Sequence, residues 1–136
     1  MTNFRLLIFV SLFLGSLFSA NAQKMTNKKL EKILETMSDT LSGNPGFWEF
    51  SIAGIPMLCI TDENHNRMRI ISPIKQMTDV SGKELDQVLK ANFHSSLDVR
   101  YAVSDDIMWV AYIHPLKELS NEQLEGAIVQ LSLIHI

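Results

Sequence analysis

The sequence predicts one α+β domain built on a mainly antiparallel, five-stranded sheet with three helices. The first observation behind this prediction is the order of hydrophobic patterns, which is α-β-β-β-α-β-β-α. Strands that come in blocks with short turns, instead of alternating strictly with helices, favour antiparallel pairing. The second observation is the composition, because 136 residues with 46% hydrophobic and 20% charged side chains suit one globular domain.

Both ends of the chain carry patterns that we interpret as lying outside this domain. Residues 1–22 are typical of a secretory signal peptide, with Arg5 before an apolar run and Ala20-Asn21-Ala22 as a cleavage site. We therefore expect an exported protein, periplasmic or secreted, with no membrane attachment after cleavage. Residues 131–136 fit the translation of a common sequencing adapter, so we interpret them as an appended tail and place the domain at 23–130.

The first half of the domain is predicted to contain a helix followed by three strands. A helix is predicted at 26–41, where one face is apolar and Gly and Pro follow within 42–46. Its apolar stripe is Leu30, Ile33, Leu34, Met37 and Leu41. Strands are predicted at 47–52, which alternates, at 55–61, which is apolar on both faces, and at 67–72, which Pro73 closes.

The second half is predicted to contain a helix, two strands and a last helix. Ser81 and Glu84 have the spacing of a capping box and predict a helix start. Strands are predicted at 98–103 and 107–114, with a turn at Ser104-Asp105-Asp106 between them. Ser120 and Gln123 repeat the capping-box spacing and predict the start of the last helix.

No catalytic or metal-binding motif is visible, so we expect no enzyme activity, no metal and no cofactor. His65, His94 and His114 lack the close spacing of zinc ligands. The run Asp62-x-Asn64-x-Asn66 begins like a calcium loop, but Arg67 and Pro73 stand where that loop needs Gly and Glu. None of the serines lies in a nucleophile motif.

Net charge and cysteine content give two further expectations, one about nucleic-acid binding and one about thiol reactivity. With 12 Lys+Arg against 15 Asp+Glu the formal charge is −3, which argues against nucleic acid. Cys59 is the only cysteine, so it cannot form an intramolecular disulfide. Its position within an apolar strand predicts a buried and unreactive thiol.

An uncovered apolar face of the sheet is the feature that points to binding. The strand at 107–114 is apolar on both faces, and three helices of modest length need not cover both. Alternatively, the second helix covers the second face within the monomer. The candidate partner or dimer interface consists of Leu85, Val88, Leu89 and Phe93 on the second helix and Met108, Val110 and Tyr112 on the last strand. The sheet edges could also accept an extended strand from a partner.

Several short sequence motifs accompany this element order. They are Leu58-Cys59-Ile60-Thr61-Asp62, Leu89-Lys90-Ala91-Asn92-Phe93, Val99-Arg100-Tyr101-Ala102 and Ile113-His114-Pro115-Leu116. Together they resemble the class I type III secretion chaperones, the family of the Tir chaperone, and the YbjN-like domains of the same fold. The resemblance implies a small acidic α+β homodimer that binds extended polypeptide without catalysis. Chaperones of this family act in the cytosol, whereas the signal-peptide pattern predicts export.

The function predicted from these observations is a non-enzymatic, exported, chaperone-like module that holds a polypeptide partner. The alternative is a small-ligand sensory domain of the YbjN-like type. That alternative needs a pocket between the first helix and the sheet, near Trp48 and Trp109.

Overall fold

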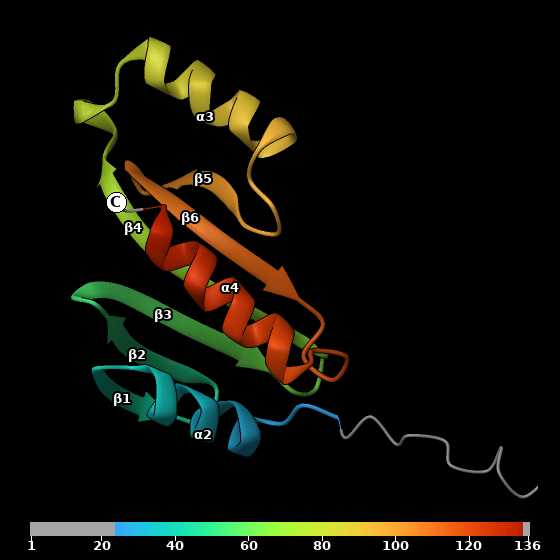
Figure 1. The fold of residues 1–136 in the computed structure, drawn as a ribbon. Coiled ribbons are helices and arrows are strands. Elements are labelled where there is room, and N and C mark those ends of the chain that lie inside the picture. Colours follow the sequence, from blue (N-terminus) through green and yellow to red (C-terminus); the bar gives the residue numbers. More distant parts are fainter. Residues whose placement is uncertain (1–23, 135–136) are drawn as a thin grey trace, which may run out of the picture.

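One six-stranded antiparallel sheet forms the centre of the molecule in the computed structural model, which describes residues 24–134 (Figure 1). The elements are α2 (Asn27–Met37), β1 (Thr40–Asn44), β2 (Phe47–Ile52), β3 (Ile55–Asp62), β4 (Arg67–Gln76), the 3-10 turn η2 (Met77–Asp79), α3 (Gly82–His94), β5 (Arg100–Ser104), β6 (Ile107–His114) and α4 (Asn121–Leu133). The strand order is β1-β2-β3-β4-β6-β5. The α+β class is confirmed, and the predicted number of five strands is corrected to six.

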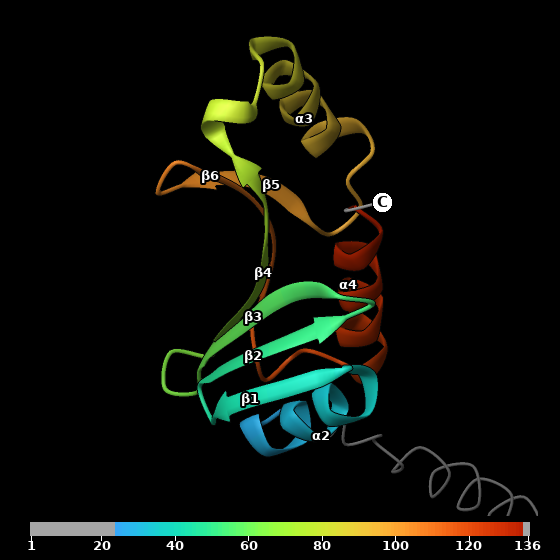
Figure 2. The same cartoon turned by 90° about the vertical axis from the view of Figure 1, so that its left-hand side faces the viewer.

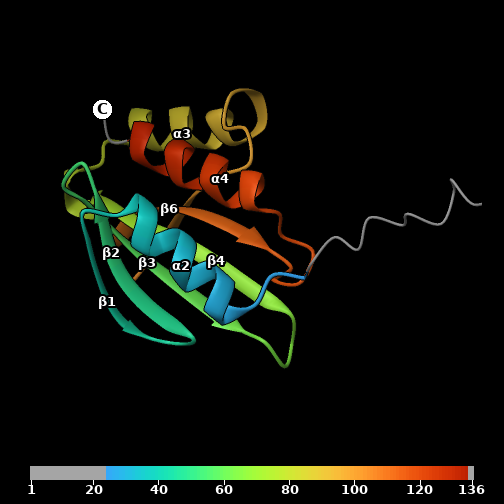
Figure 3. The same cartoon turned by 60° about the horizontal axis from the view of Figure 1, so that its bottom comes forward.

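The three helices of the described residues lie on one side of the sheet. Figures 2 and 3 show α2 beside β1, α4 across β4 and β6, and α3 beyond β5 at the far end. The opposite side of the strands is not covered by any of these helices (Figure 2). None of the helices between residues 24 and 134 has the length and apolar character needed to cross a membrane. The predicted signal peptide, residues 1–22, falls outside the described residues.

The additional strand is β1, which begins within the range of the predicted first helix. The first helix ends at Met37, since the backbone of Ser38 is extended and its hydroxyl donates to the carbonyl of Leu34. The chain then runs back as β1 and pairs with β2. Leu41 fits the stripe of a helix, yet it lies on β1 opposite Phe50 and contacts the core. One apolar residue at this spacing satisfies both periods, so the pattern alone overextends the helix.

Other boundaries move for similarly local reasons. Strand β4 runs past Pro73 to Gln76, and its pairing with β6 shifts register between Pro73 and Lys75. A bulge of this kind accommodates a residue that has no N–H for the ladder, so the prediction that Pro73 closes the strand is wrong. The strand predicted at 98–103 is observed at Arg100–Ser104. Both predicted capping boxes are confirmed, at the starts of α3 and α4.

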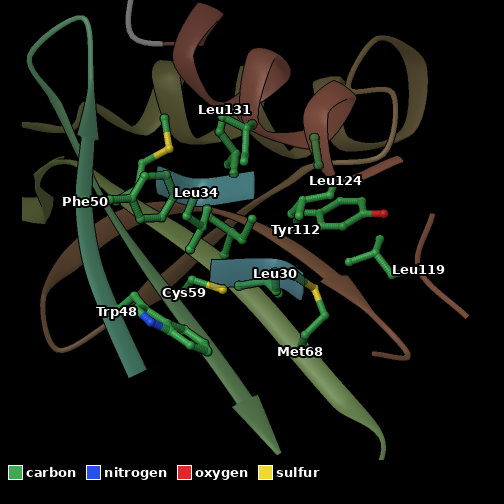
Figure 4. Close-up of a cluster of buried hydrophobic side chains, with 14 of the residues drawn as sticks. Leu30, Leu34, Trp48, Phe50, Cys59, Met68, Tyr112, Leu119, Leu124 and Leu131 are labelled. Carbon is green, nitrogen blue, oxygen red and sulfur yellow. The ribbon is translucent and has the colours of Figure 1, made fainter. Parts of the chain in front are cut away.

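The core lies between the helix-covered face of the sheet and the two helices α2 and α4. Figure 4 shows Leu30 and Leu34 of α2 and Leu124 and Leu131 of α4 directed towards side chains of the strands. The core residues contributed by the strands are Trp48, Phe50, Met57, Cys59, Met68, Ile70, Val110 and Tyr112. Leu131 is fully buried in α4. Because 135–136 lie outside the described residues, the appended-tail interpretation of 131–136 stays a prediction.

Candidate functional site

The uncovered side of the sheet carries an apolar surface that we call the open face. Its residues alternate with the core residues along the strands and are Phe47, Leu58, Ile60, Ile71, Trp109 and Ile113. Pairing brings them together in rows across the sheet: Phe47 lies opposite Ile60 and Leu58 opposite Ile71. All six are partly or fully exposed, with Ile113 at 73% and Phe47 at 45%. Neighbouring apolar side chains in solvent are typical of an interaction surface.

The structure assigns the two faces of β6 in the opposite sense to the predicted interface. Met108, Val110 and Tyr112 lie on the helix-covered face and are buried, with Val110 fully inaccessible. The alternate residues, Trp109 and Ile113 among them, lie on the open face. A strand that is apolar on both sides shows which residues share a face but not which face the helices cover. The three buried residues are therefore removed from the candidate interface.

The helical part of the predicted interface lies elsewhere, on a second apolar surface. Leu89 is 61% exposed and Phe93 86% exposed on α3. Leu97 and Val103 are also exposed at this end of the molecule. We call these four residues the α3 surface. Leu85 and Val88 are half-buried. Together with Leu89 and Val103 they line a small cavity of about 80 Å³ against Tyr101 and Met108 of the sheet. The helix thus packs on the sheet through Leu85 and Val88, whereas Phe93 and most of Leu89 remain in solvent.

No residue of α3 is fully buried. Polar contacts also attach this helix to the sheet. The side-chain amide of Asn92 donates to the carbonyl of Tyr101 at 3.1 Å, and its oxygen accepts from the N–H of Tyr101 at 2.7 Å. In this way Asn92 satisfies the outward backbone groups of an edge strand, as a neighbouring strand would. Lys75 on β4 bonds to Glu84 at 2.8 Å. This contact and those with Ser81 lower the pKa of Glu84 to about 2.

The titratable groups of residues 24–134 do not assemble a cluster suited to a metal ion. No three His, Cys, Asp or Glu side chains of that range gather at one point. His65 lies in the β3–β4 turn, His94 ends α3, and His114 ends β6. The predicted burial of Cys59 is confirmed: it is fully inaccessible, and burial raises the pKa of its thiol to about 12. A thiol held in this neutral form is a poor nucleophile.

The two tryptophans lie on opposite sides of the sheet, so they cannot line one pocket. Trp48 is buried on the helix-covered face, where its indole N–H donates to Glu31 of α2 at 3.1 Å. Trp109 is on the open face, and its N–H donates to the carbonyl of Ser104. The pocket expected near both residues for a small ligand is therefore not formed.

Sequence reasoning missed the open face as an interface. None of its six residues belongs to the predicted interface, although their alternation with buried residues is visible in the strand patterns. The orientation of Trp48 and Phe50 would have been a usable signal, because two large aromatic residues on one face of a strand favour burial. Burial of Trp48 also buries its partner Cys59, so the next residue, Ile60, lies on the opposite face. Ile113 lies in the same row across the sheet as Ile60 and therefore shares that face.

Comparison with known proteins identifies the fold. A Yersinia pestis type III secretion chaperone, SycH, solved in complex with a stable fragment of YscM2, matches with a TM-score of 0.61 and 19% identity over 81% of this chain and 97% of that chain. The HopA1–SchA chaperone–effector complex matches at 0.59 with 13% identity, over 80% and 91%. The ExsC–ExsE complex matches at 0.61 with 11% identity, over 80% and 90%. No family model and no curated protein matches the sequence.

These matches define the class of fold, which is that of the class I type III secretion chaperones, and they confirm the resemblance of the sequence to these chaperones. At 11–19% identity the likeness concerns the fold. The comparison also corrects the predicted localisation. The matched structures are type III secretion chaperones, a class that acts in the cytosol, and this points away from a periplasmic or secreted protein.

Proposed function

We propose that this protein is a non-enzymatic, chaperone-like module that holds an extended segment of another polypeptide on its open face. The observation that carries the proposal is the row of exposed apolar side chains on a sheet face that the helices of residues 24–134 leave uncovered. An extended segment presents alternate side chains to such a face. Each large apolar residue that becomes buried contributes about 1.5–3 kcal/mol to binding before ordering costs. The fold shared with chaperones solved with polypeptide partners supports this proposal.

Selection from a random-peptide library displayed on phage tests this proposal. The full chain is the bait, and two variants are compared. Ile113→Asp places a charge on the open face, whereas Val129→Asp makes the same kind of change on the outer side of α4, where Val129 is 49% exposed. We expect peptides rich in apolar residues that bind Ile113→Asp at least tenfold more weakly than the wild type and Val129→Asp unchanged. Equal binding to both variants, or no enrichment of apolar residues, would contradict the proposal.

We also propose that the protein forms a homodimer through the α3 surface. Phe93 is 86% and Leu89 61% exposed on a helix whose Leu85 and Val88 already line the contact with the sheet. A second copy would bury these side chains about a twofold axis, as most homo-oligomers do. Light scattering of the full chain should give twice the monomer mass of 15.4 kDa. Phe93→Asp should return the mass to that of the monomer, and Val129→Asp should leave the dimer intact.

A further inference from the structure

Two arginines stand at one end of the open face, beside a pocket. Arg67 and Arg69 are two residues apart on β4, so their side chains leave the same side of the sheet about 7 Å from each other. Pairing places Arg69 between Ile60 of β3 and Ile113 of β6. These four residues line a pocket of about 300 Å³, which we call the arginine pocket. It therefore combines two cations with two apolar side chains, of which Ile113 is exposed and Ile60 is half-buried.

Neither guanidinium has a partner among the residues that the structure describes. The three ion pairs of that range involve other side chains, and no side-chain hydrogen bond joins Arg67 or Arg69 to a neighbour. Asp62 also lines the pocket, but its carboxylate accepts from the backbone N–H of His65 at 3.0 Å and contacts the His65 ring at 2.6 Å. Arg100, by contrast, donates to three backbone carbonyls.

We propose that the arginine pocket binds a side-chain carboxylate of the extended polypeptide held on the open face. This inference rests on the proposed function and adds the chemistry of the partner: an Asp or Glu that lies next to, or two residues from, a large apolar residue. A guanidinium binds a carboxylate with two parallel hydrogen bonds, which gives direction as well as attraction. Ile60 and Ile113 flank Arg69 and would contact the apolar neighbours of the acidic residue.

The same library selection separates this inference from the proposed function. The peptides are fused at their C-termini, so only side chains supply carboxylates. Wild-type bait is compared with the double variant Arg67→Gln/Arg69→Gln. The control is Lys28→Gln/Lys32→Gln, which removes the same charge from exposed positions on α2. We expect the wild type and the control to enrich both acidic and apolar residues, and the arginine variant to enrich apolar residues alone.

Quantitative binding of one selected peptide completes the test. Replacing its acidic residue by Gln or Asn should weaken binding to the wild type about tenfold and leave binding to the arginine variant nearly unchanged, a non-additivity that reports direct contact. Apolar enrichment with acidic residues at the library frequency would overturn the arginine pocket and leave the proposed function standing. Absence of any enrichment would overturn both. Acidic enrichment that persists in the arginine variant would also overturn the arginine pocket.

Discussion

Replacing Val110 by alanine should destabilise the fold far more than the same replacement of Ile113, three residues further along β6. Val110 is completely buried among core residues on the helix-covered face, and Ile113 is 73% exposed on the open face. The two side chains are similar in type and belong to one strand. The difference between the two variants therefore measures which face of β6 is covered.

The expected magnitudes follow from burial. Val110→Ala removes two buried carbon groups, worth about 0.8 kcal/mol each, and leaves a cavity that raises the total cost to about 2–3 kcal/mol. Ile113→Ala removes atoms that already contact water, so its cost should stay within about 0.5 kcal/mol. For a domain of this size each kcal/mol lowers Tm by about 4 °C, so the Val110 variant should melt about 8–12 °C below the wild type.

Urea unfolding followed by tryptophan fluorescence measures both variants, because buried Trp48 becomes solvated on unfolding. The transition of Val110→Ala should move to a lower urea concentration with an unchanged slope, which indicates a change in stability alone. Equal losses of stability in the two variants, or a larger loss for Ile113→Ala, would refute the assignment of the faces.

Three further predictions concern single side chains. Asn92→Ala should accelerate hydrogen exchange of the Tyr101 amide while distant core amides keep their protection, because the amide loses its acceptor. Cys59 should stay unreacted with a thiol reagent until the protein unfolds. Burial raises its pKa from 9.0 to about 12 in the fold, so above pH 9 only the unfolded state loses the thiol proton, and the free energy of unfolding should fall as the pH rises. Lys75→Gln should raise the pKa of Glu84 from about 2 towards 4.5 in an NMR titration, because the hydrogen bond from Lys75 is the largest cause of the lowering. The stability from Glu84 is present above pH 4.5 and is lost as the pH falls towards 2.

Local signals predicted the regular elements well. The capping boxes of Ser81 and Ser120 mark helix starts by hydrogen bonds within one turn, so neighbouring residues suffice to recognise them. Strands β2 and β6 were located to the residue, because alternation and flanking turns are also local. The missed strand β1 is stabilised by pairing with β2, and Gly43 is required there since a Cβ would collide with the backbone of Phe47.

The choice of face, and with it the candidate site, depended on contacts between distant parts of the chain. The periodicity of β6 grouped Met108, Val110 and Tyr112 together correctly. Their burial, however, comes from helices distant in the sequence, because α4 packs across β4 and β6, and α3 lies over Met108. Likewise, Arg69 meets Ile113 only through pairing of strands that are separated by α3 and β5. The linear pattern thus specified the class of fold, the helix starts and, for the strands that it recognised, which residues share a side. Which side faces water followed from packing, because burial depends on the elements that come together in space.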